Sequence, residues 1–216
     1  MEAYTGAMAV RKKQPPPARV WPATSAFDVV AIGTSAGGFT ALCDILRGIR
    51  PDFQSSIVIV QHLDPHRKSQ LANLLQRYSA LTVKQAQHGE VLLPGAVYVA
   101  PPDEHLLVGP GKIQLAHTQM VHFSRPSVDL MFESVAGTYG ARAIGVVLSG
   151  NLNDGAAGIR AIKEAGGITM AQAPESAEFD SMPKAAIATG CVDYILPLDK
   201  LSATINGLYI ELPAHA

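Results

Sequence analysis

The chain has 216 residues, 48% of them hydrophobic, and a formal net charge of -1 at pH 7. This length fits one α/β domain with short extensions, and the near-zero charge excludes binding to nucleic acid or a membrane that depends on a strong electrostatic field. No apolar run is long enough to span a bilayer, and the first residues lack the apolar segment of a signal peptide, so we expect a cytoplasmic protein. The two cysteines, Cys43 and Cys191, have neither a disulfide framework nor a metal-ligand spacing, and we expect buried free thiols.

Residues 1–26 are predicted to form a flexible leader. The basic stretch Arg11 to Lys13 precedes three prolines, Pro15 to Pro17, which favour an extended and solvated backbone. A basic, proline-rich stretch could also dock a partner protein, and the sequence leaves that alternative open. We place the core at residues 27–205 and a C-terminal tail at 206–216.

From residue 27 onward, short apolar runs typical of strands alternate with runs that have the apolar spacing of helices. Such alternation is typical of a parallel sheet covered by helices on both faces. The predicted strands and helices lie, in chain order, at 27–32 (strand), 38–47 (helix), 56–60 (strand), 68–78 (helix), 127–138 (helix), 143–148 (strand), 155–165 (helix), 168–171 (strand), 181–189 (helix) and 193–196 (strand).

The middle of the chain departs from this alternation. Three short apolar runs, at 97–100, 105–108 and 112–115, are separated by Pro-Pro-Asp and Gly-Pro-Gly. These breakers indicate an antiparallel β-hairpin at one edge of the sheet. The sequence therefore predicts a doubly wound, mostly parallel α/β fold with Rossmann-like layers, plus this hairpin.

The most informative motif is Gly-Thr-Ser-Ala-Gly-Gly at residues 33–38, between the first predicted strand and the first predicted helix. It matches the G-x-S-x-G pattern of a nucleophile elbow. A serine on such a turn projects its hydroxyl clear of the backbone, and the N–H groups that begin the helix can bind a developing anion. The motif predicts Ser35 as a nucleophile, although a phosphate-binding turn or a helix N-cap would use similar residues.

A dinucleotide-binding turn is the main alternative to a nucleophile here. Such a turn requires glycine where Ser35 stands, and an Asp or Glu after the next strand to bind the ribose. The next predicted strand is followed by Gln61 and His62 instead. No cofactor is therefore predicted, and a histidine follows the strand next to the serine.

Three polar residues with complementary chemistry follow predicted parallel strands. Ser35 follows the first strand, His62 the second, and Asp154 a later strand. The carboxyl ends of parallel strands meet at one edge of an open sheet, where ligands bind. Serine, histidine and aspartate at that edge form the nucleophile, base and orienting acid of acyl transfer. We expect His62 to lie between Ser35 and Asp154, with one ring nitrogen facing each.

Each of these residues also has a simpler interpretation. His62 could close its strand as an ordinary polar residue, and Asp154 could cap the helix predicted to begin near Gly155. No two of the remaining histidines have the spacing of a zinc motif with a glutamate, so no metal site is predicted. They are expected at the surface or in the hairpin, and they are His66, His88, His105, His117 and His122.

Several separated motifs occur together in one order. They are Ile-Gly-Thr-Ser-Ala-Gly-Gly at 32–38, Val-Gln-His at 60–62, Val-Tyr-Val-Ala-Pro at 97–101, Ser-Arg-Pro-Ser-Val-Asp at 124–129, Leu-Ser-Gly at 148–150 with Asn-Asp-Gly-Ala-Ala-Gly at 153–158, and Met-Pro-Lys-Ala-Ala at 182–186. With these motifs, residues 27–201 resemble the catalytic domain of the CheB-type chemoreceptor protein-glutamate methylesterases.

This resemblance implies a function and a substrate. It implies that Ser35, His62 and Asp154 form a catalytic triad, and that backbone N–H groups at Ala36 and Asn151 support the oxyanion. It implies hydrolysis of γ-glutamyl methyl esters, and deamidation of certain glutamines, on the cytoplasmic helical bundle of methyl-accepting chemotaxis receptors. It does not imply a cofactor, binding to nucleic acid or insertion into a membrane.

Two positions depart from the pattern of the family. Ala36 replaces the usual threonine after the serine, and Leu152 replaces a glycine in the loop before Asp154. A leucine is unfavourable wherever the backbone φ is positive. Family members usually carry an N-terminal receiver domain. Because residues 1–26 are too few to form one, we expect constitutive activity, control by a partner protein, or a catalytic fragment.

A second function class remains open beside the esterase. A noncatalytic module could keep this fold and use the cleft to bind a receptor or a signalling partner. The complete Ser, His and Asp set favours the enzyme, whereas Ala36 and Leu152 favour the binding module. A nucleotide-binding protein is disfavoured because the acid for the ribose is missing.

Overall fold

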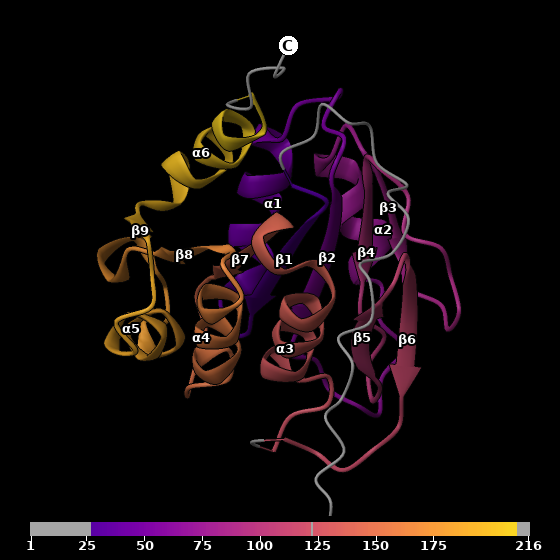
Figure 1. Ribbon diagram of the computed structural model, residues 1–216. Helices are drawn as coiled ribbons and strands as arrows, with labels where there is room; N and C mark the ends of the chain where they lie inside the picture. Colours follow the sequence, from indigo (N-terminus) through magenta and orange to yellow (C-terminus); the bar gives the residue numbers. More distant parts are fainter. Residues whose placement is uncertain (1–26, 122, 211–216) are drawn as a thin grey trace, which may run out of the picture.

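The computed structural model describes residues 27–121 and 123–210, and its centre is a parallel β-sheet (Figure 1). Within the described chain the sheet has seven strands in the order β3-β4-β2-β1-β7-β8-β9. Every neighbouring pair in it is parallel. The strands are β1 (Val29–Thr34), β2 (Ser56–Gln61), β3 (Thr82–Gln85), β4 (Ala96–Val99), β7 (Ala143–Val147), β8 (Ile168–Gln172) and β9 (Tyr194–Leu196).

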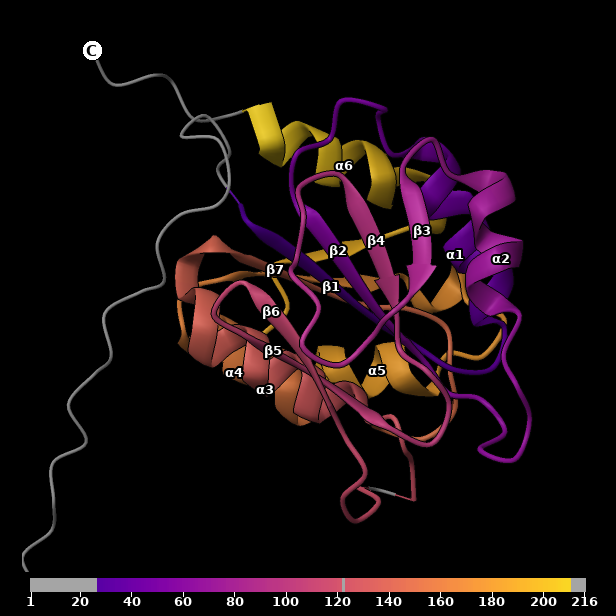
Figure 2. The ribbon, with the colours of Figure 1, turned by 90° about the vertical axis from the view of Figure 1, so that its right-hand side faces the viewer.

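Helices cover both faces of this sheet, as Figure 2 shows. On one face lie α1 (Gly38–Gly48), α2 (Leu71–Leu75) and α6 (Leu198–Ile210). On the other lie α3 (Val128–Tyr139), α4 (Ala156–Glu164) and α5 (Ser181–Ala188). Short 3₁₀ turns occur at Gln76–Tyr78, Gly140–Arg142 and Pro174–Ser176. This is the predicted three-layer, doubly wound α/β fold.

Alternating side chains of the central strand, β1, pack into two separate apolar cores. Val29 and Ala31 of β1 pack on the α3 side, whereas Val30 and Ile32 pack on the α1 side. All six residues of β1 are buried. Successive side chains of a strand point to opposite faces, so a strand covered on both sides reads as a continuous apolar run. That is why the periodicity identified β1 so clearly.

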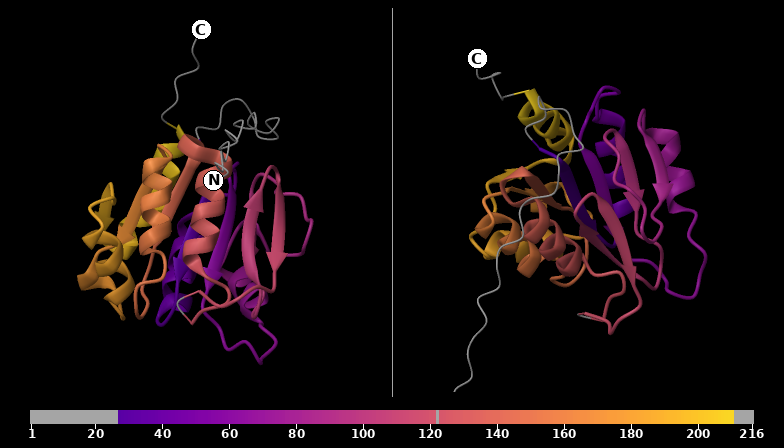
Figure 3. Two further views of the ribbon diagram at one scale, coloured as in Figure 1. Left: turned by 60° about the horizontal axis from the view of Figure 1, so that its bottom comes forward. Right: turned by 45° about the vertical axis from the view of Figure 1, so that its right-hand side comes forward.

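The antiparallel hairpin is a separate two-stranded sheet, β5 (His105–Gly109) with β6 (Lys112–Ala116). It lies beside α3 (Figure 3), and its apolar side chains join the core on that face of the main sheet. The run at 97–100 was grouped with the hairpin from the sequence. It instead enters the main sheet as β4, between β3 and β2.

Three details differ from the sequence prediction. Strand β3 was missed, because only Val83 of its four residues is buried and the segment carries no clear alternation. Helix α6 was also missed, and it runs through the boundary placed between residues 205 and 206. The helix predicted at 68–78 is a short α-helix followed by a 3₁₀ turn. The leader at 1–26 lies outside the described residues.

A close approach between Gly33 and Val128 determines how α3 packs on the sheet. Gly33 of β1 faces Val128, the first residue of α3, and a Cβ at position 33 would collide with the Val128 side chain. Glycine at this position lets the start of the helix reach the carboxyl end of β1. Among the described residues, no helix has both the length and the apolar character needed to cross a bilayer.

Candidate active site

The site lies at the carboxyl edge of the sheet, where β1 separates β2 from β7. Thr34 pairs with Gln61 across β1 and β2, so Ser35 and His62 directly follow paired residues on neighbouring strands. The His62 N–H donates to the Thr34 carbonyl at 3.1 Å. The chain runs from β1 to β2 on one side and reaches β7 on the other, which makes this the switch point where open α/β sheets bind ligands.

Ser35 stands on a tight turn whose backbone is held from three directions. Its N–H donates to the Ser149 carbonyl at 3.0 Å, and its own carbonyl accepts from the Gln61 side-chain amide at 2.6 Å and from the Gly38 N–H at 3.0 Å. Gly37 has a φ of 72°, a conformation that favours glycine. At Gly38 an added Cβ would lie 2.3 Å from side-chain atoms of Thr34 and Gln61, so both glycines suit the turn, and α1 begins at the second of them.

Ser149 braces the far side of this turn. Its hydroxyl donates to the Ala36 carbonyl at 2.8 Å and accepts from the Phe179 N–H at 3.0 Å. Within the described part of the chain, the N–H groups of Ala36, Gly37 and Asn151 have no hydrogen-bond acceptor. Ala36 and Gly37 directly precede α1, whereas Asn151 lies in the loop between β7 and α4, and backbone N–H groups without an acceptor can stabilise an oxyanion.

The structure brings His62 and Asp154 together. The His62 Nε2 donates to Asp154 Oδ2 at 2.8 Å, and the Asp154 side chain is only 2% exposed. This bond fixes the ring so that Nδ1 is the nitrogen left for another partner. Among the described residues no hydrogen bond joins the Ser35 hydroxyl to His62, and such bonds are often long in unliganded sites.

Asp154 accepts hydrogen bonds from the start of α3 as well as from His62. The N–H groups of Val128 and Asp129 donate to it at 2.8 and 2.9 Å, and the Ser127 hydroxyl donates at 3.0 Å. Burial alone would raise the pKa of Asp154, but the hydrogen bonds from His62, Asp129 and Val128 outweigh burial and lower the pKa below its ordinary value. The carboxylate therefore stays ionised at neutral pH.

Asp154 does not cap the helix that follows it, which was the simpler interpretation of its sequence position. It caps α3, which begins 26 residues earlier in the chain. The N-terminus of α4 is capped by Asp129, whose Oδ1 accepts from the N–H groups of Gly155 and Gly158. Sequence spacing does not encode such an exchange between two helices.

A scan of protein-family models matches residues 30–205 to the CheB methylesterase family. The chain belongs to the CheB methylesterase family. The Thermotoga maritima CheB methylesterase catalytic domain superposes on this structure with a TM-score of 0.80 at 36% identity, covering 84% of this chain and 98% of that domain.

Curated proteins of this family are similar along most of the chain. A protein-glutamate methylesterase/protein-glutamine glutaminase of Anaeromyxobacter dehalogenans is 42% identical over 181 residues, which is 84% of this chain and 53% of that protein. A putative enzyme of the same name from Leptospira interrogans is 39% identical over 177 residues, 82% of this chain and 92% of that protein. The chain thus spans about half the length of some relatives and nearly all of others.

The loop before Asp154 contains the departure at Leu152. Leu152 has a φ of 65° and is 67% exposed, so this CheB-family chain places leucine where the backbone favours glycine. The structure thus has at Leu152 the positive φ at which leucine is expected to be unfavourable. Asn151 is exposed beside it.

His105 is buried, unlike a surface histidine. It lies on β5 of the hairpin, its Nδ1 accepts from the Ser127 N–H at 3.1 Å, and its Nε2 donates to the Gln119 carbonyl at 2.9 Å. It therefore fastens the residue that precedes α3. His66, His88 and His117 are exposed, and His122 lies outside the described residues.

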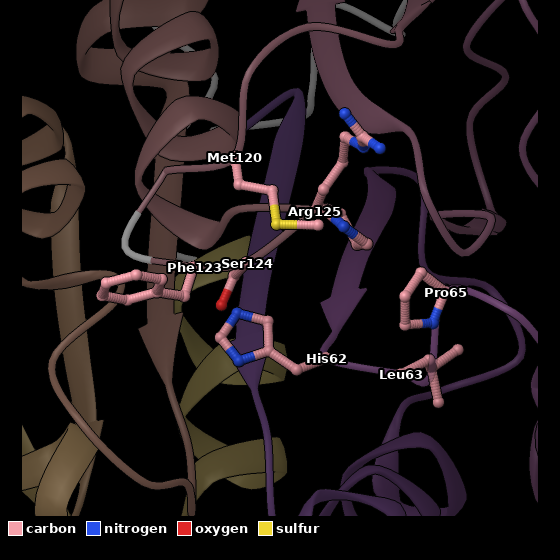
Figure 4. Close-up of a pocket in the computed structure, with 8 residues that line it drawn as sticks. His62, Leu63, Pro65, Met120, Phe123, Ser124 and Arg125 are labelled. Carbon is pink, nitrogen blue, oxygen red and sulfur yellow. The ribbon is translucent and has the colours of Figure 1, made fainter.

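A cavity of about 140 Å³ opens beside His62 (Figure 4). Leu63 and Pro65 line it from the loop after β2, and Met120, Phe123 and Ser124 line it from the loop before α3. The Phe123 side chain is 95% exposed at its rim. The lining combines apolar side chains with the polar groups of His62, Ser124 and Arg125.

Some functional residues were not found from the sequence. Ser127 and Asp129 lie in the motif at 124–129, but their contacts with the 149–158 region come from folding. The helix N-cap pattern at Ser127 was the available signal. Of the two cysteines, Cys43 is buried and Cys191 is half-buried rather than buried. No group of three metal-binding side chains gathers within residues 27–121 and 123–210.

Proposed function

We propose that this chain is a protein-glutamate methylesterase that also deamidates selected glutamines, with Ser35 as nucleophile, His62 as base and Asp154 as orienting acid. The observation that carries the proposal is the hydrogen bond from His62 Nε2 to the buried Asp154 carboxylate, beside the Ser35 turn at the switch point of the sheet. The names of the relatives support the same activity.

The geometry supports a sequence of proton transfers. Ser35 Oγ attacks the γ-carbonyl carbon of a methyl-esterified glutamate while His62 Nδ1 takes the hydroxyl proton. Asp154 holds the opposite nitrogen and stabilises the imidazolium that forms. The free N–H groups of Ala36 and Asn151 donate to the tetrahedral oxyanion.

Collapse of that intermediate breaks the bond to the methoxy oxygen, and the imidazolium returns its proton so that methanol leaves. Water, deprotonated by His62, then attacks the acyl-enzyme and releases a glutamate carboxylate and free Ser35. For a glutamine the leaving group is ammonia, and the second half is identical.

The substrate we propose is the cytoplasmic helical bundle of a methyl-accepting chemotaxis receptor, and a regulatory partner protein would control access to it. The exposed rim at Met120 and Phe123 supports docking of a helical surface, because amphipathic helices present side chains at regular spacing to such grooves. The alternative function is a noncatalytic binding module, and the following experiment distinguishes it from the enzyme.

The test is methanol release from a methylated receptor fragment by the wild type and by Ser35→Ala. Loss of a triad nucleophile typically costs several orders of magnitude in turnover. The Ser35 hydroxyl makes no hydrogen bond within the described chain, so the melting temperature is expected to stay unchanged.

Ser124→Ala is the matched control, because Ser124 lines the cavity beside His62 and could be mistaken for the nucleophile. It is expected to keep its turnover. More than about a tenth of wild-type turnover in Ser35→Ala contradicts the assignment, and a wild type without activity on any methylated receptor favours the binding module.

A further inference from the structure

Two carboxylates at the base of the site each accept hydrogen bonds from the N-terminus of the helix next to the other carboxylate. Asp154, just before α4, accepts from the N–H groups that begin α3, and Asp129, in the first turn of α3, accepts from the N–H groups that begin α4. The distances from Asp129 Oδ1 to the Gly155 and Gly158 nitrogens are 2.9 and 2.7 Å. We call this pair of contacts the carboxylate exchange.

The carboxylate exchange is buried and closely packed. Asp129 and Asp154 are 3% and 2% exposed, and the positive end of each helix dipole stabilises the charge that it faces. At Gly158 an added Cβ would lie 2.5 Å from the Phe132 Cβ and 3.0 Å from the Asp129 backbone. Only glycine lets α4 approach α3 closely enough for Asp129 to reach the N–H groups of α4.

The exchange also fixes one end of the loop at 150–155. At its first residue the Gly150 N–H donates to the Phe179 carbonyl, and the Gly150 carbonyl accepts from the Met182 N–H. At its last residues the Asp129 carboxylate holds Gly155, directly after Asp154. Asn151, the proposed oxyanion donor, lies between these two anchors.

We propose that Asp129 is a positioning residue for the reaction: through Gly155 and Gly158 it holds Asp154 against His62 and holds the loop of Asn151 in place, without touching the substrate. This inference rests on the proposed function. It gives a role to the last residue of the Ser-Arg-Pro-Ser-Val-Asp motif, whose function the triad leaves unexplained.

Asp129→Ala removes the two contacts to α4 and leaves the backbone N–H of residue 129 in place for Asp154. The Asp154 carboxylate and the oxyanion loop are then free to shift, and a displacement of about 1 Å in a catalytic constellation can cost on the order of 100-fold in rate. We expect kcat for methanol release to fall by about that factor while KM stays within about twofold, because substrate contacts are untouched.

Asp129→Asn is the conservative variant. Its amide oxygen accepts from the same two N–H groups, so kcat is expected to recover to within about fivefold of the wild type, since two hydrogen bonds to a charged acceptor are weakened but not lost. Asp129→Ser, one bond shorter, replaces the alanine variant if that variant does not accumulate as folded protein, and it is expected to show the same loss of kcat.

Asp193→Ala is the matched control for lost stability. Asp193 accepts from the N–H and hydroxyl of Thr169, near the start of β8 and hence at the sheet edge opposite the site, and it pairs with Lys163 in the last turn of α4, at the end of that helix remote from Asp129. It is expected to lower the melting temperature without lowering kcat.

The outcomes separate the two proposals. If the wild type releases methanol and Ser35→Ala does not, the proposed function stands and the Asp129 variants test this inference alone. Unchanged kcat in Asp129→Ala or Asp129→Ser overturns it, and so does a loss in Asp129→Asn as large as in the alanine variant. An equal loss of kcat in Asp193→Ala at a matched melting temperature overturns it as well.

Discussion

Leu152 has a backbone conformation that is unfavourable for its side chain. Its φ of 65° is costly for leucine by about 1–2 kcal/mol, and its side chain is 67% exposed and so loses little packing on truncation. We expect Leu152→Gly to raise kcat more than it changes KM, because relaxing the loop lets the Asn151 N–H turn toward the oxyanion. Steady-state kinetics on a methylated receptor peptide measure both constants.

Leu152→Ala is the control for this change, because alanine shares the penalty at positive φ and is expected to keep the kcat of the wild type. Glycine also adds entropy to the unfolded chain, which offsets part of the relieved strain. Unchanged turnover in Leu152→Gly together with a lower melting temperature would show that the loop has adapted to leucine.

Asp154 makes the stability of the fold depend on pH at the acid end. Burial raises its pKa, but the hydrogen bonds from His62 and from the start of α3 prevail, so the folded pKa lies below the unfolded value of about 3.9. A depressed folded pKa gives stability that is present above the unfolded pKa and is lost as the pH falls through the folded pKa.

The wild type should therefore lose free energy of unfolding from about pH 4 downward more steeply than Asp154→Asn, which has no proton to take up. Urea unfolding at a series of pH values measures the difference, and the two curves should converge at the most acid end. Parallel curves over the whole range would show that Asp154 has an ordinary pKa in the folded state.

At the scale of elements, two glycines near α3 are expected to respond in opposite ways to alanine. Gly33→Ala pushes a methyl group into Val128 at the start of α3, and overpacking of this kind typically costs 1–3 kcal/mol, here about the middle of that range. Because the Val128 N–H binds Asp154, we expect kcat to fall together with the melting temperature.

Gly137→Ala is the matched substitution, made within the helix that Gly33 contacts. Gly137 lies inside α3, is exposed, and a Cβ there meets nothing within 4 Å. Alanine should stabilise the protein by about 0.5–1 kcal/mol, because glycine is a poor helix residue. Thermal unfolding measures both variants, and a stable, fully active Gly33→Ala would show that α3 can move away from β1 at no cost.

Elements with strong apolar periodicity were predictable, and those that depend on remote contacts were not. Strand β1 is buried on both faces and its apolar run is unmistakable, whereas β3 has a single buried residue and no such pattern. The run at 97–100 was recognised as a strand but not given its parallel partners, because pairing between β4 and β2 is a property of the whole sheet.

The residues of the candidate site were also predictable only in part. Ser35, His62 and Asp154 each follow a strand, so the parallel topology was enough to predict that they share an edge. The capping of α3 by Asp154, and of α4 by Asp129, joins residues that are 26 positions apart and show no distinctive spacing. Those contacts depend on how α3 and α4 pack.

At the scale of the whole molecule, the leader is expected to be dispensable for folding. The first described strand begins at Val29 and the family match begins at residue 30. Deleting residues 1–25 should leave esterase activity unchanged and shift the melting temperature by less than about 3 °C, which corresponds to less than about 1 kcal/mol for a domain of this size. A larger fall would show that the leader packs on the core.

The position of β1 in the sheet has a consequence for the newly made chain. One side of β1 pairs with β2 soon after both are synthesised, but its other side pairs with β7, more than a hundred residues later. For roughly ten seconds of translation, a largely apolar strand therefore presents an open edge of N–H and C=O groups. An open edge of that kind is a template for pairing with strands of other chains, so we expect the nascent polypeptide to be less prone to aggregate once β7 has covered β1.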